Sequence, residues 1–194
     1  MDANQDLPQA IVDEFVGNAH GNFARVKELL EQYPALVNAK AAWGETAIEA
    51  AAQTGSRPIM ELLLAAGAPM DICTAAVMGL KDEVAEMLTA DPAQAQATGA
   101  HGIPVLHFPC IGGHRDIAEL LLAHGAEVNA GEGSNTPLHG TAMFGQLEMT
   151  RWLLDHGANV NAPDYEGKTP LFRAQQNGHM AVADLLRERG GEES

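Results

Sequence analysis

Residues 125–157 read GAEVNAGEGSNTPLHGTAMFGQLEMTRWLLDHG and contain the pattern from which the fold can be predicted. Thr136 stands directly before Pro137, which is the arrangement of a helix N-cap followed by proline at the first helical position. Gly145 and Gly157 can adopt the left-handed backbone conformation that ends a helix. The stretch therefore predicts two consecutive helices joined by a glycine turn.

The same pattern recurs along the whole chain. A mid-repeat glycine is followed by an apolar residue and then by a leucine pair, as in Ile117 with Leu120 and Leu121. This spacing forms one face of an amphipathic helix. Recurrence about every 33 residues predicts a stack of repeats, because no single repeat can bury its apolar face alone. The glycines follow one another at steps of 34, 24, 34, 32 and 33 residues: Gly21, Gly55, Gly79, Gly113, Gly145 and Gly178.

Residues 136–139 (Thr-Pro-Leu-His) and the segments 125–130 and 157–162 resemble the opening and closing motifs of the ankyrin repeat. The resemblance is specific in the last three repeats and weaker in the first three, where the second opens with Thr-Ala-Ile-Glu at residues 46–49. It implies an all-α ankyrin-repeat solenoid, in which each repeat is a helix, a turn, an antiparallel helix and a short β-hairpin-like finger. By the same resemblance, fingers and first helices line a concave face that binds other proteins.

We expect a single ankyrin-repeat domain over residues 1–194. The first and last repeats carry polar outer faces, as the ends of a solenoid require, which predicts a monomer. Residues 1–10 lack a basic and an apolar segment, so we expect no signal peptide. The six repeats are expected at residues 7–42, 43–69, 70–100, 101–132, 133–165 and 166–191.

The 24-residue step predicts that the finger of the third repeat is missing. Residues 67–72 match the closing motif, and the next helix begins at once with Cys73. The gap would lie between the fingers that carry Trp43 and His101. It is either a loop deletion without functional consequence or a notch that admits a partner side chain or a small ligand.

Pro109 is a second departure from the repeat pattern. It falls at about the fifth helical position of the fourth repeat and removes one hydrogen bond of the helix. We expect a kinked or 3₁₀-like helix start there. Such strain can mark a functional site, although proline near a helix N-terminus is also simply tolerated.

The charge balance restricts the class of partner. The 194 residues include 26 acidic and 11 basic side chains, for a formal net charge of −15. Such a field repels phosphate backbones and anionic lipid, so we expect neither nucleic acid nor membrane as a partner, and favour a protein with a basic surface. No apolar run is long enough to span a membrane. Two cysteines, Cys73 and Cys110, suit a reducing compartment and predict a cytoplasmic location.

Eight histidines raise the question of metal binding or catalysis. His107, Cys110 and His114 follow one helical face and could hold zinc, and Cys110 with His107 could form a nucleophile–base couple. The competing interpretation is an inert, packed thiol and histidines that bond neighbouring turns. We favour the second interpretation and expect no metal, no cofactor and no catalytic residue. The histidines that recur at repeat positions are His107, His114, His124, His139, His156 and His179.

The function that we expect is non-catalytic recognition of a protein partner on the finger and first-helix face. Exposed Trp, Tyr and Arg side chains dominate the energetics of such interfaces. The alternative is a small-ligand or catalytic site in the notch between the third and fourth repeats. The expected partner contacts are Trp43, His101, Phe108, Tyr165 and Arg173. The alternative notch set is Cys73, His101, His107 and Phe108.

Overall fold

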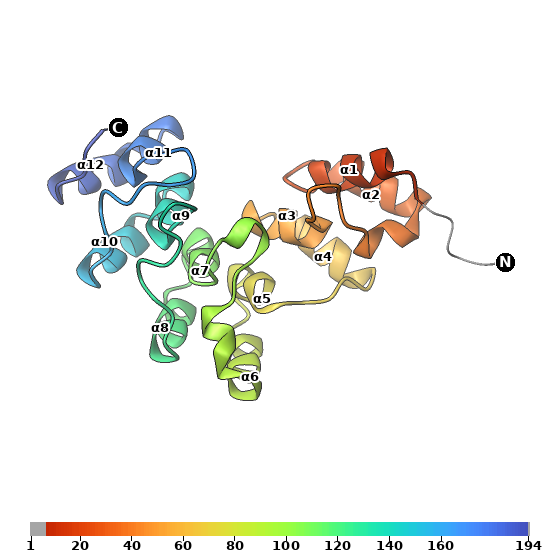
Figure 1. Cartoon of the computed structure of the whole chain (residues 1–194), viewed down its shortest axis with the longest axis horizontal. Coiled ribbons are helices and arrows are strands. Elements are labelled where there is room, and N and C mark those ends of the chain that lie inside the picture. The colour runs from red at the N-terminus through yellow and green to blue at the C-terminus, as the bar shows by residue number, and fades with distance from the viewer. Residues whose placement is uncertain (1–6, 194) are drawn as a thin grey trace. The chain divides into compact units, whose positions relative to one another are not determined.

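The computed structural model describes residues 7–193, and within them the chain forms six consecutive pairs of α-helices and no sheet (Figure 1). The expected all-α fold is therefore confirmed, and each expected repeat contains one pair. The pairs are α1 (Gln9–Asn18) with α2 (Phe23–Gln32), α3 (Ala47–Gln53) with α4 (Arg57–Ala65), α5 (Ile72–Met78) with α6 (Lys81–Ala90), α7 (His107–Gly112) with α8 (Arg115–Ala123), α9 (Pro137–Phe144) with α10 (Leu147–Asp155), and α11 (Pro170–Gln176) with α12 (Met180–Glu188).

The segments between pairs carry the fingers. Two fingers are closed by isolated β-bridges: the second finger (residues 40–46) by Lys40 with Thr46, and the fourth finger (residues 98–104) by Thr98 with Pro104. Residues 124–136 separate α8 from α9 and contain the fifth finger, whereas residues 66–71 alone separate α4 from α5. Three 3₁₀ helices lie in the other connections: η1 (Pro34–Asn38), η2 (Pro92–Gln96) and η3 (Ala100–Gly102).

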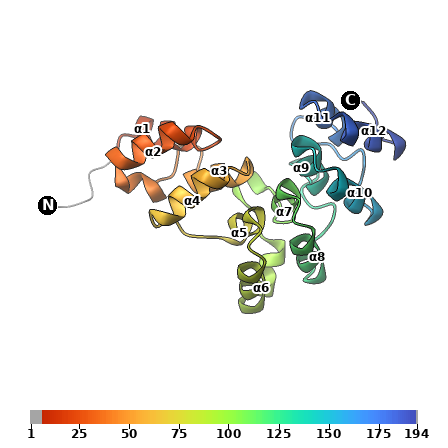
Figure 2. The ribbon, with the colours of Figure 1, turned by 180° about the vertical axis from the view of Figure 1, so that it is seen from behind.

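The described residues divide into two compact parts, which we call the N-terminal half (up to Thr74) and the C-terminal half (from Ala75). In the N-terminal half, α1 packs on α2 and α3, and α2 packs on α4 (Figure 2). Phe15, Ile59 and Leu63 are fully buried there. The single domain over the whole chain, with its repeat bounds, stays a prediction.

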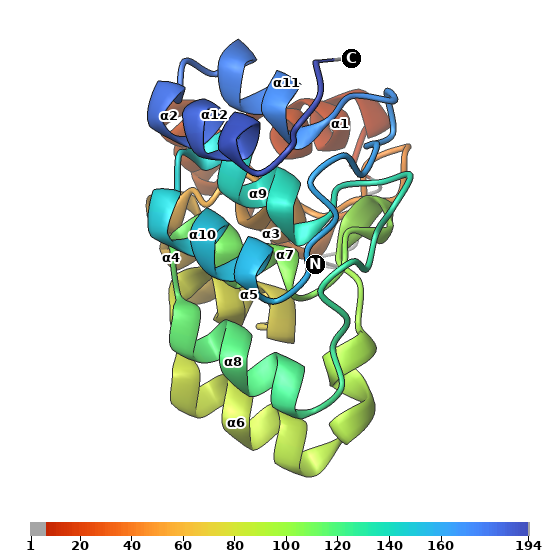
Figure 3. The same ribbon diagram turned by 90° about the vertical axis from the view of Figure 1, so that its left-hand side faces the viewer.

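In the C-terminal half, the first helices α7, α9 and α11 pack in one row (Figure 3). Among the second helices, α6 packs on α8 and α10 on α12. Ile117 and Leu121 of the predicted leucine-pair motif are fully buried, as are Leu138 and Leu153. The apolar stripes of successive helices thus form one continuous core, as expected when neighbouring repeats stabilise each other.

A glycine turn joins the two helices of a pair. Gly113 and Gly145 have φ values of 74° and 71°, in the left-handed region. The N–H of the residue after each glycine bonds a carbonyl five residues earlier, at 2.9 Å for His114 to Pro109 and 2.9 Å for Gln146 to Thr141. These bonds satisfy carbonyls at the end of the first helix and fix the direction of the second.

The side chain after the glycine also reaches the preceding repeat. His114 donates from Nε2 to the Val77 carbonyl at 3.2 Å, and His179 donates to the Met143 carbonyl at 3.0 Å. Gln146 donates to the Ile111 carbonyl at 2.7 Å. Hydrogen bonds between neighbouring turns were expected of these histidines, and the structure confirms them.

The 3₁₀-like start expected at Pro109 is present. The N–H groups of His107 and Phe108 bond the carbonyls three residues earlier, Pro104 at 2.9 Å and Val105 at 3.2 Å. In a regular α-helix the N–H of residue 109 would bond the Val105 carbonyl, but proline has no N–H. The Phe108 N–H donates to this carbonyl instead. The α-helix therefore begins at His107, two residues later than α9 does relative to its opening motif, and this carbonyl is still paired.

Replacing Gly145 by alanine should destabilise the protein through two effects. A left-handed backbone costs a non-glycine residue about 1 kcal/mol, and the added Cβ would lie 2.5 Å from His179 Nδ1. Gly178→Ala is the matched control, because Gly178 has φ +77° and nothing within 4 Å of its added Cβ. Urea unfolding should show a larger loss for Gly145→Ala than for Gly178→Ala, and equal losses would contradict the crowding by His179.

Candidate protein-interaction surface

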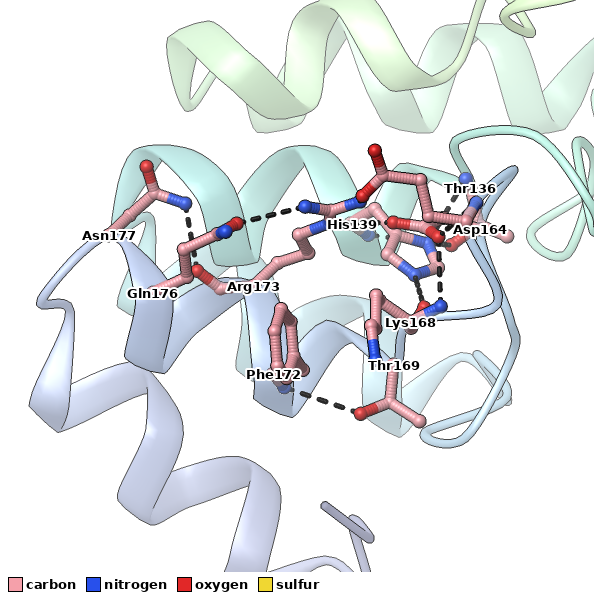
Figure 4. Close-up of polar contacts among 10 residues, drawn as sticks. Thr136, His139, Asp164, Lys168, Thr169, Phe172, Arg173, Gln176 and Asn177 are labelled. Carbon is pink, nitrogen blue, oxygen red and sulfur yellow. Dashed lines mark hydrogen bonds and ion pairs between the residues drawn. The ribbon is translucent and has the colours of Figure 1, made fainter. Parts of the chain in front are cut away.

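The sixth finger, residues 163–169, is tied to the first helix of its own repeat. Thr169 caps α11 by accepting a hydrogen bond from the Phe172 N–H at 3.3 Å. This cap starts the helix at Pro170, and Arg173 follows one turn later. Figure 4 shows the Arg173 side chain extending along the helix toward Asp164 of the finger.

A buried ion pair joins the finger to α11. Arg173 Nε lies 2.6 Å from Asp164 Oδ2, and the two side chains are 9% and 0% exposed. Arg173 also contacts Glu166 Oε2 at 2.5 Å and Gln176 Oε1 at 2.9 Å. Burial by itself raises the pKa of Asp164, but hydrogen bonds from Arg173 and from the Lys168 and Glu166 N–H groups hold it below its usual range. Both members of the pair therefore stay charged.

The ion pair fixes the part of the finger that carries Tyr165. Asp164 Oδ1 accepts hydrogen bonds from the Glu166 and Lys168 N–H groups at 2.8 and 2.9 Å, on the C-terminal side of Tyr165. The Tyr165 ring is 66% exposed, and the Arg173 guanidinium lies 5.8 Å from its centroid. The finger thus presents an aromatic ring over a fixed charge.

Arg173 was expected as an exposed partner contact, and this expectation is wrong. The residue is 7% exposed, because Asp164, Glu166 and Gln176 enclose its head group. Arg173 holds the finger in place through Asp164. Its effect on the exposed surface is therefore indirect, through the position of Tyr165.

Histidine hydrogen bonds extend from the sixth finger to the two preceding repeats. His139 donates from Nε2 to the Lys168 carbonyl at 3.0 Å, and its Nδ1 accepts from the Thr136 hydroxyl at 2.8 Å (Figure 4). His107 donates to the Thr136 carbonyl at 2.9 Å. Burial lowers the pKa of His107 to about 4 despite this bond, so the ring is neutral at pH 7.

Phe108 was also expected on the exposed face, and the structure shows it inside. The side chain is 1% exposed. Its ring lies under the fourth finger, so close to Gly99 that an added Cβ there would be 2.6 Å from Phe108 Cζ. An edge contact at 5.9 Å joins the ring to His107. His101, in contrast, is exposed at the tip of this finger, with a φ of 58°.

The second finger, in the N-terminal half, follows the same principle as the sixth. Trp43 is 48% exposed and donates from Nε1 to Glu45 Oε2 at 2.8 Å. Glu45 is 2% exposed, and its other oxygen accepts from Gln53 of α3 at 2.7 Å. A buried carboxylate again connects an exposed aromatic residue to a first helix.

The sequence analysis did not identify Glu45, Gln53 or Asp164. The available signal was a carboxylate within two residues of a finger aromatic, followed by a polar residue one or two turns into the next helix. In the sixth repeat that polar residue was noted as Arg173, but without its acidic partner.

The residues considered for catalysis are enclosed. Cys73 and Cys110 are 3% and 0% exposed, and burial raises the pKa of both thiols, which keeps them protonated and weakly nucleophilic. Of the notch set, Cys73, His107 and Phe108 are buried and His101 alone is exposed. Among residues 7–193, no three His, Cys, Asp or Glu side chains come together as a metal site would require. The notch itself stays a prediction.

A family model described as ankyrin repeats (3 copies) matches residues 15–132 and 129–193. The chain belongs to the ankyrin-repeat family. This ankyrin-repeat protein is similar to human cyclin-dependent kinase 4 inhibitor B, with 33% identity over 130 residues that cover 65% of the chain and 91% of the relative. Human cyclin-dependent kinase inhibitor 2A is 34% identical over 134 residues, covering 66% and 85%.

A third relative aligns with almost the whole length of this chain. The Caenorhabditis elegans ankyrin repeat and KH domain-containing protein mask-1 is 31% identical over 189 residues, which are 94% of this chain but 6% of that protein. The ankyrin-repeat protein is thus a protein–protein interaction module. None of the helices described between residues 7 and 193 combines the length and apolar character needed to cross a bilayer.

Asp164→Asn should destabilise the C-terminal half by about 2 kcal/mol, because it removes the buried carboxylate of the Arg173 ion pair and leaves that charge with the half-exposed Glu166. Asp184→Asn is the matched control: its pair with Arg187 is exposed, at 68% and 42%, and should contribute less than about 0.5 kcal/mol. Urea unfolding measures both losses. Similar values for the two variants would contradict the structural weight given to the buried pair.

Stability should fall in mild acid because of His107. Its pKa of about 4 in the folded state lies below the ordinary value of about 6.5, so the unfolded chain binds more protons between these values. The free energy of unfolding should decrease from this group by up to about 1.4 kcal/mol per pH unit as the pH falls from about 6.5 to about 4. Urea titrations between pH 7 and 4 test this, and His107→Gln should flatten the slope. An NMR titration midpoint of the His107 ring near 6.5 would contradict it.

Proposed function

We propose that the ankyrin-repeat protein is a non-catalytic adaptor that binds a partner protein through its fingers and first helices. The observation that carries the proposal is the Tyr165 ring, two-thirds exposed on a finger that a buried ion pair holds in place. A restrained aromatic side chain gives up little conformational entropy on binding and buries a large apolar area. Trp43, fastened by Glu45, offers the same combination in the N-terminal half.

The partner has a basic surface. The net charge of −15 steers cationic surfaces toward the protein, and Glu132 and Glu166 are exposed on the fifth and sixth fingers. Two relatives are named as inhibitors of cyclin-dependent kinases, which makes a protein kinase the first class of partner to test. Binding of a basic partner weakens as salt rises, since exposed charges are screened beyond roughly 10 Å at 0.1 M ionic strength.

Tyr165→Ala and Trp43→Ala test the proposal in a capture experiment. A partner retained by the wild-type protein should bind roughly tenfold or more weakly to at least one variant, as is typical for truncation of an interface aromatic residue. Met180→Ala is the matched control, because Met180 is a 49% exposed apolar residue on α12 and not on a finger. Affinities are measured by calorimetry or surface plasmon resonance with the captured partner.

The control also defines the result that would overturn the proposal. A partner whose affinity is unchanged by both finger substitutions and reduced by Met180→Ala would bind the second-helix face instead.

A further inference from the structure

A pocket of about 350 Å³ lies at the base of the second finger, entirely within the N-terminal half. Its walls come from the end of η1, from the β-bridged base of the finger and from the segment after α4. The volume falls at the lower end of the roughly 300–1,000 Å³ range of ligand pockets. The lining residues are Val37, Asn38, Lys40, Thr46, Ile48, Gly67 and Pro69.

The C-terminal half contains an equivalent pocket that is smaller. Adding 58 to the residue numbers converts Val37, Lys40 and Ile48 into Ala95, Thr98 and Leu106, which line a cavity of about 100 Å³. That cavity has additional walls, Ala130 and Gly131, from the fifth finger. The fifth finger therefore occupies part of this position and leaves a smaller cavity.

The contact made by the covering finger is close. A Cβ added to Gly131 would lie 2.8 Å from Pro104 Cδ, so the finger backbone lies directly on the proline ring. The residue equivalent to Pro104 in the N-terminal half is Thr46, which lines the larger pocket.

In the N-terminal half, the chain soon after Pro69 forms helix α5, so this segment does not form a finger over the pocket. Asp71 Oδ1 accepts a hydrogen bond from the Thr74 N–H at 2.7 Å, and α5 begins at Ile72. Ile72 and Cys73, the equivalents by number of Ala130 and Gly131, are buried helical residues. The pocket at the second finger is therefore larger because the chain forms a helix where the equivalent position forms a finger.

The pocket combines an apolar lining with a cation. Val37, Ile48 and Pro69 supply apolar surface, and Lys40 is exposed at the rim. Lys40 forms no ion pair with any residue between 7 and 193, whereas Arg25 and Arg57 of the same half each pair with glutamate. An uncommitted ammonium beside apolar surface favours a carboxylate next to an apolar group.

We infer that this pocket receives a loop of the partner protein that carries a large apolar side chain next to an aspartate or glutamate. The inference rests on the proposed function, because it names the chemistry of a partner loop. The partner's loop takes the place that a finger fills in the other half of the molecule. A local acidic residue is compatible with a basic partner overall, since charges farther than about 10 Å from Lys40 are screened at 0.1 M salt.

An NMR titration of the full-length ¹⁵N-labelled protein tests the pocket without a natural partner. The probe is the peptide acetyl-Gly-Leu-Glu-Gly-amide at millimolar concentration. We expect saturable shift changes confined to the amides of residues 37–40, 46–48, 67 and 68, which line or adjoin the pocket. Acetyl-Gly-Leu-Gln-Gly-amide, without the charge, should bind at least about twofold more weakly. Acetyl-Gly-Ala-Glu-Gly-amide, without the apolar anchor, should bind about tenfold more weakly.

Two variants test the pocket from the protein side. Lys40→Glu should weaken the probe by about threefold or more through charge reversal, and Val37→Trp should abolish binding by filling the pocket. Lys27→Glu is the matched control, because Lys27 is exposed on α2 of the same half and pairs with Glu31. It should leave the affinity unchanged. Thermal unfolding of each variant shows that the N-terminal half remains folded.

The absence of saturable shifts in the wild-type protein would overturn the inference. So would shifts that persist in both Lys40→Glu and Val37→Trp, or that centre on Trp43. The proposed function is judged separately, since partner capture that depends on Tyr165 or Trp43 survives failure of the peptide titration.

Discussion

Hydrogen bonds donated by side chains to main-chain carbonyls of adjacent repeats are the interactions on which the C-terminal half depends. A pair of short helices cannot bury its own apolar face, and its ends leave carbonyl groups without helical partners. His107 and His139 reach the carbonyls at the start of the next repeat, while His114 and His179 reach back to the end of the previous first helix. These bonds set the register in which the leucine faces meet.

The requirement for close approach explains the glycines as well as the histidines. Gly145 must adopt a left-handed conformation to end its helix, and it must also leave room for the His179 ring. At Gly178, in the last repeat, no following ring is present and the added Cβ would meet nothing within 4 Å. Glycine is thus required at Gly178 by the backbone conformation alone. At Gly145 it is required by the backbone conformation and also by the packing of the His179 ring.

Buried carboxylates convert this scaffold into a surface for recognition. Asp164 and Glu45 lie inside the fold. Asp164 bonds the finger backbone beside the exposed Tyr165, and Glu45 accepts a hydrogen bond from the ring N–H of Trp43, which is about half exposed. The cost of burying a charge is offset only when the partner and the hydrogen bonds are in place, so the finger geometry is strictly fixed. The second finger adds a pocket beneath its base, where Lys40 stands without an acidic partner among the described residues.

Local sequence patterns were enough to predict much of the fold of this protein. The helix pairs, the glycine turns, the 3₁₀ start at Pro109 and the bonding of the repeat histidines follow from residues within a few positions or one repeat of each other. The expected exposure of Phe108 and Arg173 was wrong, because burial depends on what other segments place around a side chain. The contacts of Phe108 with Gly99 and of Arg173 with Asp164 join a first helix to the finger before it, and no repeat motif marks these contacts. The pocket at the second finger is likewise a property of tertiary structure, because its walls include segments 21 residues apart, at Thr46 and Gly67.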